Sequence, residues 1–181
     1  MTQTNGTSRL AAVVFDRDEP GDAALAAFLA EAARSGARVG GLVQEGAEDE
    51  LCALHDVRVR DLMTGESLPI MQNLGPGATG CRVNPAAIAA AARMLDRARE
   101  AAPDLLVVNR FGRLEREGGG MLAEIGQAFA DGLAVLVCVP RRFLEGWDAF
   151  AGGLDVKLPP SAEAIGRWWE RVQPARSDAA A

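Results

Sequence analysis

Short apolar segments alternate with amphipathic helical segments along this 181-residue chain, and this alternation constrains its fold more than any other feature. Residues 10–15 (LAAVVF) form a continuous apolar run, which is typical of a strand covered on both faces. Residues 20–36 then carry apolar side chains at helical spacing, with Pro20 near the start and Gly36 just past the end. Residues 38–43 (RVGGLV) are predicted to form a second strand, and a strand–helix–strand unit implies parallel pairing.

The same alternation continues to the end of the chain. Over residues 56–73, polar and apolar residues alternate around a turn at Thr64-Gly65-Glu66, which predicts an inserted β-hairpin. Asn84 is a suitable cap for the next helix, with Pro85 at its first position. The remaining predicted elements are a strand at 105–109, a helix holding Met121 to Phe129, a strand at 134–139, and two amphipathic helices carrying the three tryptophans around a short DVKL segment. The sequence therefore predicts an α/β fold, a three-layer sandwich around a mostly parallel sheet with one inserted hairpin.

Composition and charge narrow the class of protein. We expect one α/β domain over residues 10–172, with polar or small-residue ends at 1–9 and 173–181 that are disordered. A formal net charge of −6 argues against nucleic-acid binding, which needs a basic face. Without a long apolar run or a signal-peptide pattern, we expect no membrane association and a cytoplasmic location. The 3 cysteines are widely spaced and fit free thiols better than a disulfide or zinc framework.

In open α/β sheets, ligands bind beyond the carboxyl ends of the strands, so the loops there are the candidates for a site. Three such loops are predicted, at residues 16–22, 44–46 and 109–115. The glycine-rich segment 75–82 is placed to close over them. The most distinctive of these loops is 109–115, where the apolar strand LLVVN runs into the sequence NRFGRLE.

The element order, together with the segments GGLVQ, LMTGE and NRFGRLE, resembles the small nucleoside triphosphatases of the P-loop class. It resembles more closely an uncharacterised bacterial family, the domain of unknown function 2478, over about residues 9–153. In the triphosphatases the matching motif is Asp-Glu-x-Gly-Lys-x-Glu. This sequence keeps the glycine (Gly112), a basic residue (Arg113) and the final glutamate (Glu115) of that motif. It has Asn109 and Arg110 in place of the two leading carboxylates. The uncharacterised family has the Asn, basic, Phe-Gly, basic, x, Glu form directly.

The phosphate loop departs from the pattern that the triphosphatases require. That pattern, G-x-x-x-x-G-K-[ST], cradles phosphates with backbone N–H groups, neutralises them with lysine and holds Mg²⁺ with a hydroxyl. When Gly21 is aligned with the second glycine, Asp22 stands in place of lysine and Ala23 in place of the hydroxyl residue. Asp16 also replaces the first glycine. Arg110 also cannot act as a base, because a guanidinium group keeps its proton. The resemblance therefore implies that the scaffold is retained and that the hydrolytic machinery is absent.

A ligand site is nevertheless predicted at the same sheet edge. Arg110, Arg113 and Arg82 would form a planar clamp for a phosphate, sulfate, carboxylate or tetrahedral metal oxyanion. The full predicted ligand-binding set is Arg17, Gly21, Arg82, Asn109, Arg110, Gly112, Arg113 and Glu115. No metal site is predicted, and no catalytic residue is assigned.

Simpler interpretations of the same residues stay open. Arg113 could pair with Glu115 or Glu117, and Asn109 could satisfy a local turn through its side chain. The acidic residues near the start of the 20–36 helix could complement the helix dipole. Residues 118–120, three consecutive glycines, could be either a hinge or only a loose entry to the next helix.

Two functional hypotheses follow. The first is a non-hydrolytic binding or regulatory protein that holds a small anion or a nucleotide, and family resemblance adds a link to molybdate and molybdenum-enzyme metabolism. The second is a divergent nucleoside triphosphatase in which Arg17, Arg110 or Arg113 replaces the missing lysine. No cofactor is assigned beyond a nucleotide or an oxyanion such as molybdate. A homodimer formed through the tryptophan-bearing helices stays open as a third possibility.

Overall fold

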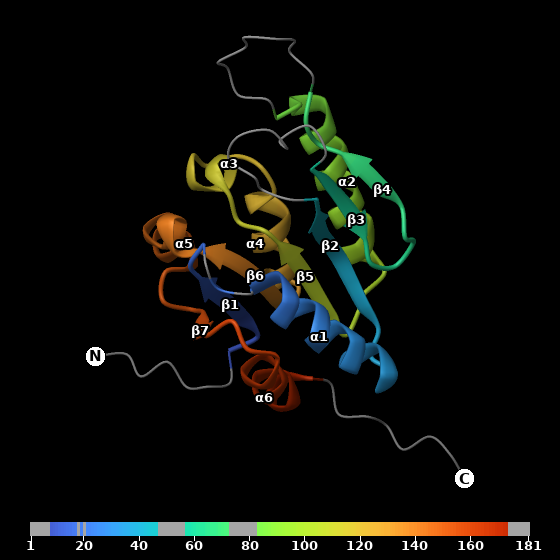
Figure 1. Ribbon diagram of the computed structural model, residues 1–181, viewed down its shortest axis with the longest axis vertical. Coiled ribbons are helices and arrows are strands. Elements are labelled where there is room, and N and C mark those ends of the chain that lie inside the picture. Colours follow the sequence, from blue (N-terminus) through green and yellow to red (C-terminus); the bar gives the residue numbers. More distant parts are fainter. Residues whose placement is uncertain (1–7, 18, 20, 47–56, 73–82, 174–181) are drawn as a thin grey trace.

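A computed structural model describes residues 8–17, 19, 21–46, 57–72 and 83–173, and these residues form an α/β fold (Figure 1). The strands are β1 (Leu10–Phe15), β2 (Val39–Glu45), β3 (Arg58–Asp61), β4 (Ser67–Pro69), β5 (Leu105–Asn109), β6 (Ala134–Pro140) and β7 (Val156–Leu158). The helices are α1 (Gly21–Arg34), α2 (Pro85–Glu100), the short α3 (Arg113–Arg116), α4 (Leu122–Ala130), the 3₁₀ turn η1 (Arg141–Phe143), α5 (Leu144–Ala151) and α6 (Ala162–Val172).

The described strands make one seven-stranded sheet in the order β4-β3-β2-β5-β6-β1-β7. Strands β2, β5, β6, β1 and β7 pair in parallel, and β3 and β4 add antiparallel pairs at one edge. Because connections between parallel strands need crossovers, helices lie on the faces of this sheet. The predicted mostly parallel sheet with a hairpin insert is confirmed.

Two apolar cores, one on each face of the sheet, make the three layers. On one face α2, α4 and α5 pack against alternate strand residues, with Leu95, Ile125 and Trp147 buried among them. On the other face α1 and α6 supply Phe28 and Trp168 to a second buried cluster. All three tryptophans of α5 and α6 lie in these two clusters.

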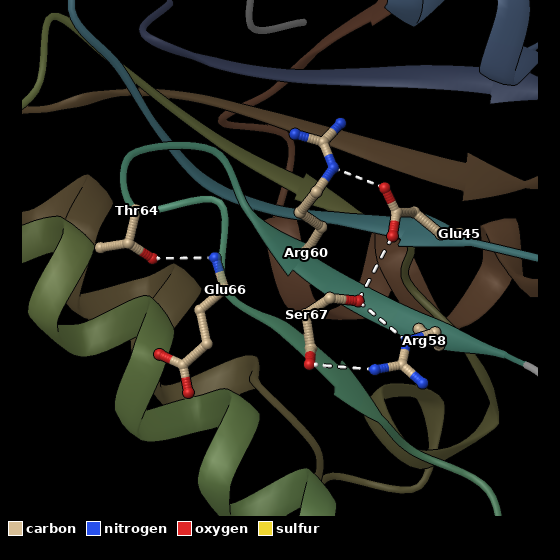
Figure 2. Close-up of polar contacts among 6 residues, drawn as sticks. All are labelled: Glu45, Arg58, Arg60, Thr64, Glu66 and Ser67. Atoms are coloured by element: carbon tan, nitrogen blue, oxygen red, sulfur yellow. Dashed lines mark hydrogen bonds and ion pairs between the residues drawn. The ribbon is translucent and has the colours of Figure 1, made fainter.

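The hairpin shows how residue alternation fixes strand register. Val59 of β3 is buried against the core under α2, so its neighbours Arg58 and Arg60 point to the opposite face (Figure 2). There Arg60 Nε lies 2.5 Å from Glu45 Oε1 of β2, and Arg58 Nε donates to Ser67 Oγ of β4 at 3.0 Å. These contacts join three adjacent strands across one polar face.

Two local details differ from or sharpen the sequence prediction. Strand β2 continues to Glu45, beyond the predicted end at Val43, because Gln44 and Glu45 pair with Val59 and Arg58 of the hairpin. The predicted cap of α2 is confirmed, since Asn84 Oδ1 accepts hydrogen bonds from the N–H groups of the first turn of the helix.

Among the described residues, none of the helices combines the length and the apolar composition needed to cross a bilayer.

Candidate functional site

The end of β5 and the beginning of α1 meet at the carboxyl edge of the sheet. Strands β5, β6 and β1 are parallel neighbours in that order, so their carboxyl ends lie along the same edge. Asn109 ends β5, and α1 begins at Gly21 after the short loop that follows β1. This arrangement brings together residues almost ninety positions apart and corresponds to the ligand-binding edge of open α/β sheets.

The centre of the site is the carboxylate of Asp22, in the first turn of α1. Asn109 Nδ2 donates to Asp22 Oδ1 at 3.1 Å, and Arg110 Nη2 donates to Asp22 Oδ2 at 2.8 Å. The Asn109–Arg110 peptide bond is cis. Both carboxylate oxygens of Asp22 are thus held by donors from the end of β5.

Burial differs sharply between the two partners of this ion pair. The side chain of Arg110 is only 12% exposed, whereas that of Asp22 is 58% exposed. The Arg110 guanidinium carbon also lies 5.4 Å from the centre of the Phe15 ring, within the range of a cation–π contact. The cation is therefore held in place by its surroundings, while the carboxylate lies at the solvent side of the site.

Asn109 is a second buried polar group at this point, only 3% exposed. Its Nδ2 contacts Asp22, but its Oδ1 is buried and has no hydrogen-bond partner among the described residues. The sequence left open that Asn109 satisfies a local turn. Its side chain instead reaches across to α1. Buried polar atoms without a partner are uncommon in folded proteins, and a functional role is one of their explanations.

The loop between β1 and α1 is closed by its own acidic residues. Glu19 N donates to Asp16 O at 3.1 Å, and Asp16 N donates to Glu19 Oε2 at 2.6 Å. Arg141 Nε, at the start of η1, donates to Asp16 Oδ2 at 2.7 Å, and this carboxylate raises the pKa of Arg141. The two acidic residues Asp16 and Asp22 therefore each contact an arginine.

Gly21 and Glu115, two of the predicted ligand-binding residues, have packing roles. A Cβ on Gly21 would lie 2.8 Å from Cγ of Phe15, so glycine lets α1 begin directly against that ring. Glu115 is 6% exposed, and its carboxylate accepts from Gly112 N at 2.8 Å and from Met121 N at 3.1 Å. Glu115 thereby ties the start of α3 to the start of α4.

The glycine segment 118–120 is bonded to the same small helix. Gly118 N donates to Glu115 O at 3.0 Å and Gly119 N to Leu114 O at 2.9 Å. Gly120 has φ of 61°, and a Cβ there would lie 2.0 Å from Glu115 Oε1. These contacts favour a fixed connection between α3 and α4 over a hinge.

The other predicted arginines lie in different surroundings. Arg113 Nε donates to Glu117 Oε1 at 2.8 Å along α3, which is one of the two pairings that the sequence left open. Arg17 is exposed in the turn after β1, and Arg82 lies outside the described residues. The structure therefore brings Asn109, Arg110 and the beginning of α1 together, and it directs Arg113 along its own helix.

Sequence reasoning missed two members of this site. Asp22 was not among the predicted ligand-binding residues, yet it binds the two residues at the end of β5. Arg141 was not singled out, although its position directly after the carboxyl end of β6 is the same signal that identified Arg110.

Cys138, on the strand between β1 and β5, is buried, and this burial raises the pKa of its thiol to about 12.

A comparison with protein-family models identifies the family of this chain. The model of the family described as "Protein of unknown function (DUF2478)" matches residues 10–168. The chain belongs to the DUF2478 family. The segments 16–23 and 109–115 both lie inside the matched range.

Two proteins of known name are similar to this DUF2478 chain. A molybdenum import ATP-binding protein, ModC 2 of Bradyrhizobium diazoefficiens, is 35% identical over 162 residues. That match covers 90% of this chain but only 18% of the relative, so the chain spans less than a fifth of that protein's length. The solution structure of a human cancer-related nucleoside triphosphatase superposes with a TM-score of 0.58 at 16% identity, over 78% of this chain and 84% of that one. This likeness confirms a fold of the P-loop triphosphatase type.

Proposed function

We propose that this chain is a non-hydrolytic regulatory protein that binds a small oxyanion or the phosphate group of a nucleotide and acts in molybdate uptake. The observation that carries the proposal is the contact of Asp22 with Asn109 and Arg110. It places a carboxylate, itself a small anion, on two donors at the edge of the sheet where such folds bind phosphates.

The residues present do not fit the hydrolytic machinery of a triphosphatase. Asn109 is neutral where a carboxylate would hold Mg²⁺, and Ala23 offers no hydroxyl to the metal. Arg110 keeps its proton and cannot activate a water molecule. In addition, Asp22 would repel a triphosphate at the position where lysine would attract it.

The same residues suit an anion that replaces the Asp22 carboxylate. Arg110 is nearly buried and presents a planar fork of donors, and the Asn109 amide lies beside it. The first turn of α1 adds the positive end of a helix dipole. Because Asp22 is more than half exposed, its side chain can rotate into water when an anion arrives.

The link to molybdate rests on sequence similarity. The relative with 35% identity is a molybdenum import ATP-binding protein, and the shared region is 18% of it. Since the lysine and hydroxyl of a phosphate loop are absent here, we assign this region a regulatory role beside an ATPase instead of the ATPase role itself.

Binding is tested by thermal shift and calorimetry with molybdate, tungstate, sulfate, phosphate, ATP and GTP. We expect Arg110→Ala to abolish binding of the oxyanion and Asp22→Asn to tighten it about tenfold, because the competing carboxylate charge is removed. Ligand at 100 times its dissociation constant should stabilise the fold by about 2.7 kcal/mol. Arg167→Ala is the matched control, since Arg167 pairs with Glu163 on the exposed side of α6.

Two results would overturn the proposal. One is the absence of any shift, in both the wild type and Asp22→Asn, at millimolar concentrations of every anion. The other is sustained release of phosphate from ATP or GTP with Mg²⁺ that disappears in Arg110→Ala or Arg113→Ala. The second result would establish the divergent triphosphatase, which the similarity of fold keeps as the alternative.

A further inference from the structure

A separate pocket lies between the carboxyl ends of β1 and β7 and the beginning of α5. Its volume is about 250 Å³, and its apolar lining includes Val14 and Leu144 from the α5 face of the sheet, Leu158 from the other face, and Pro159 and Pro160 at the end of β7. Pockets for whole drug-sized ligands occupy about 300–1,000 Å³, so this one suits a single ring system. It adjoins the loop that leads into α1, on the side away from β5.

Three charged side chains complete the lining: Glu19, Arg141 and Lys157. Arg141 uses Nε for Asp16, and within the described part of the chain its two terminal nitrogens donate to no protein acceptor. Glu19 Oε2 accepts from Asp16 N, and its Oε1 accepts from no group of the described residues. The contact with Asp16 therefore fixes both side chains and leaves a donor fork and a carboxylate oxygen for a ligand.

Lys157 is held at one side of the pocket by neighbouring carboxylates. Its Nζ lies 2.8 Å from Asp148 Oδ1 and 3.5 Å from the buried Asp155 Oδ2. Asp148 in particular raises the pKa of Lys157, so the ammonium group is charged at neutral pH. The polar pattern open to a ligand is thus a guanidinium donor and a carboxylate acceptor beside apolar lining residues.

We propose that this pocket binds a guanine base. Guanine has an acceptor, O6, next to two donors, N1–H and the 2-amino group, on one edge. Arg141 would donate to O6, as arginine commonly does in base recognition, and Glu19 would accept from N1–H and the amino group. Val14 and Leu144, which belong to the same apolar cluster, would contact the face of the ring. Adenine presents a donor and an acceptor in the reverse order, so it leaves both side chains unmatched.

This inference rests on the proposed function, because it names the base of the nucleotide whose phosphate would replace the Asp22 carboxylate. The two sites are nevertheless made of different residues. The base pocket uses Glu19 and Arg141, whereas the anion site uses Asn109 and Arg110. A ligand without phosphate therefore tests the base pocket alone.

The experiment titrates the protein with guanosine and follows the methyl resonances of Val14, Leu144 and Leu158 by NMR. We expect guanosine to shift these resonances saturably, inosine to bind more weakly because it lacks the 2-amino group, and adenosine to leave them in place. Glu19→Gln should weaken guanosine at least tenfold, because a donor replaces one carboxylate oxygen. The remaining amide oxygen of that variant can still accept from Asp16 N, so the loop is kept.

Glu163→Gln is the control, since Glu163 is a similarly exposed glutamate on α6 outside this pocket. Equal binding of guanosine and adenosine, or equal weakening in Glu19→Gln and Glu163→Gln, would overturn the inference. Failure of guanosine while oxyanions still bind in an Arg110-dependent way would sink the base pocket and keep the proposed function. Binding of guanosine without any oxyanion binding would keep the base pocket and contradict the proposed function.

Discussion

At the scale of single residues, burial decides which arginines of the motif are fixed parts of the site. Arg110 and Arg113 are only three positions apart, but their side chains are 12% and 66% exposed. Arg110 lies against Phe15 and binds Asp22, whereas Arg113 makes a surface pair with Glu117. Exposed pairs of the second kind contribute about 0–1 kcal/mol, so we assign the ligand-holding role to Arg110.

Cys138 gives a prediction at the same scale. Burial raises the pKa of its thiol from 9.0 to about 12, so the folded state favours the neutral thiol. The stabilisation that results is complete below the pKa of the unfolded chain and is lost as the pH rises from about 9 toward 12. Urea unfolding between pH 8 and 11 should show this loss, and Cys138→Ala should lack that part of the slope.

Thiol labelling provides the control for Cys138. At pH 8 the peptide that contains it should react slowly in native protein and rapidly in denaturant, as followed by mass spectrometry. Native labelling as fast as in the denatured chain would show that the thiol is not buried as described.

At the scale of elements, the connection between α3 and α4 is built around one buried carboxylate. Glu115 accepts N–H groups from Gly112 and Met121, and Gly120 leaves the space that its carboxylate occupies. The motif residues Gly112 and Glu115 therefore shape the segment that follows β5.

Replacing Gly120 by alanine tests this connection. The new Cβ would meet Glu115 Oε1 at 2.0 Å and the residue would keep a φ of 61°, so we expect a loss of about 2–4 kcal/mol in the free energy of unfolding. Gly132→Ala is the matched control, because Gly132 has φ of 82° with nothing within 4 Å of an added Cβ. It should cost only about 1 kcal/mol. Equal losses in urea unfolding would mean that the Glu115 contact adds nothing.

At the scale of the whole molecule, one sheet separates two apolar cores and serves both of them. Trp147 is buried on the α5 side, and Trp168 is buried on the α6 side, where its Nε1 donates to Ser8 O at 2.9 Å. Since the central strands contribute alternate residues to both clusters, we expect the two cores to unfold together. A single domain over residues 10–172 remains the prediction that follows.

Truncation of Trp168 tests that prediction. We expect Trp168→Ala to lower the free energy of unfolding by about 3–5 kcal/mol, the usual cost of removing a large buried aromatic side chain. Far-UV circular dichroism and the fluorescence of the remaining tryptophans should still follow one coincident transition. Two separated transitions would mean that the α6 side unfolds independently and that the chain is not one cooperative domain.

Much of the fold could be predicted because its signals are local in the sequence. The apolar run LAAVVF, the helical spacing of Leu25 and Phe28, and the alternation around Thr64-Gly65-Glu66 each report on a few consecutive residues. The cap at Asn84 is local in the same sense. The short helix α3 was not predicted, because the side chain of Glu115 organises it from within the loop.

The candidate site was predicted from the positions of loops, and the contacts within it were not predicted. The sequence alone determined an α/β fold, and it predicted that a ligand site lies at the loops after β1 and β5. Only the tertiary structure decided that Asp22 binds Asn109 and Arg110, and that Glu19 and Arg141 line a pocket with β7. The physical reason is that hydrophobic periodicity fixes each element separately. Contacts between strand ends depend on strand order, and here β6 inserts between β5 and β1.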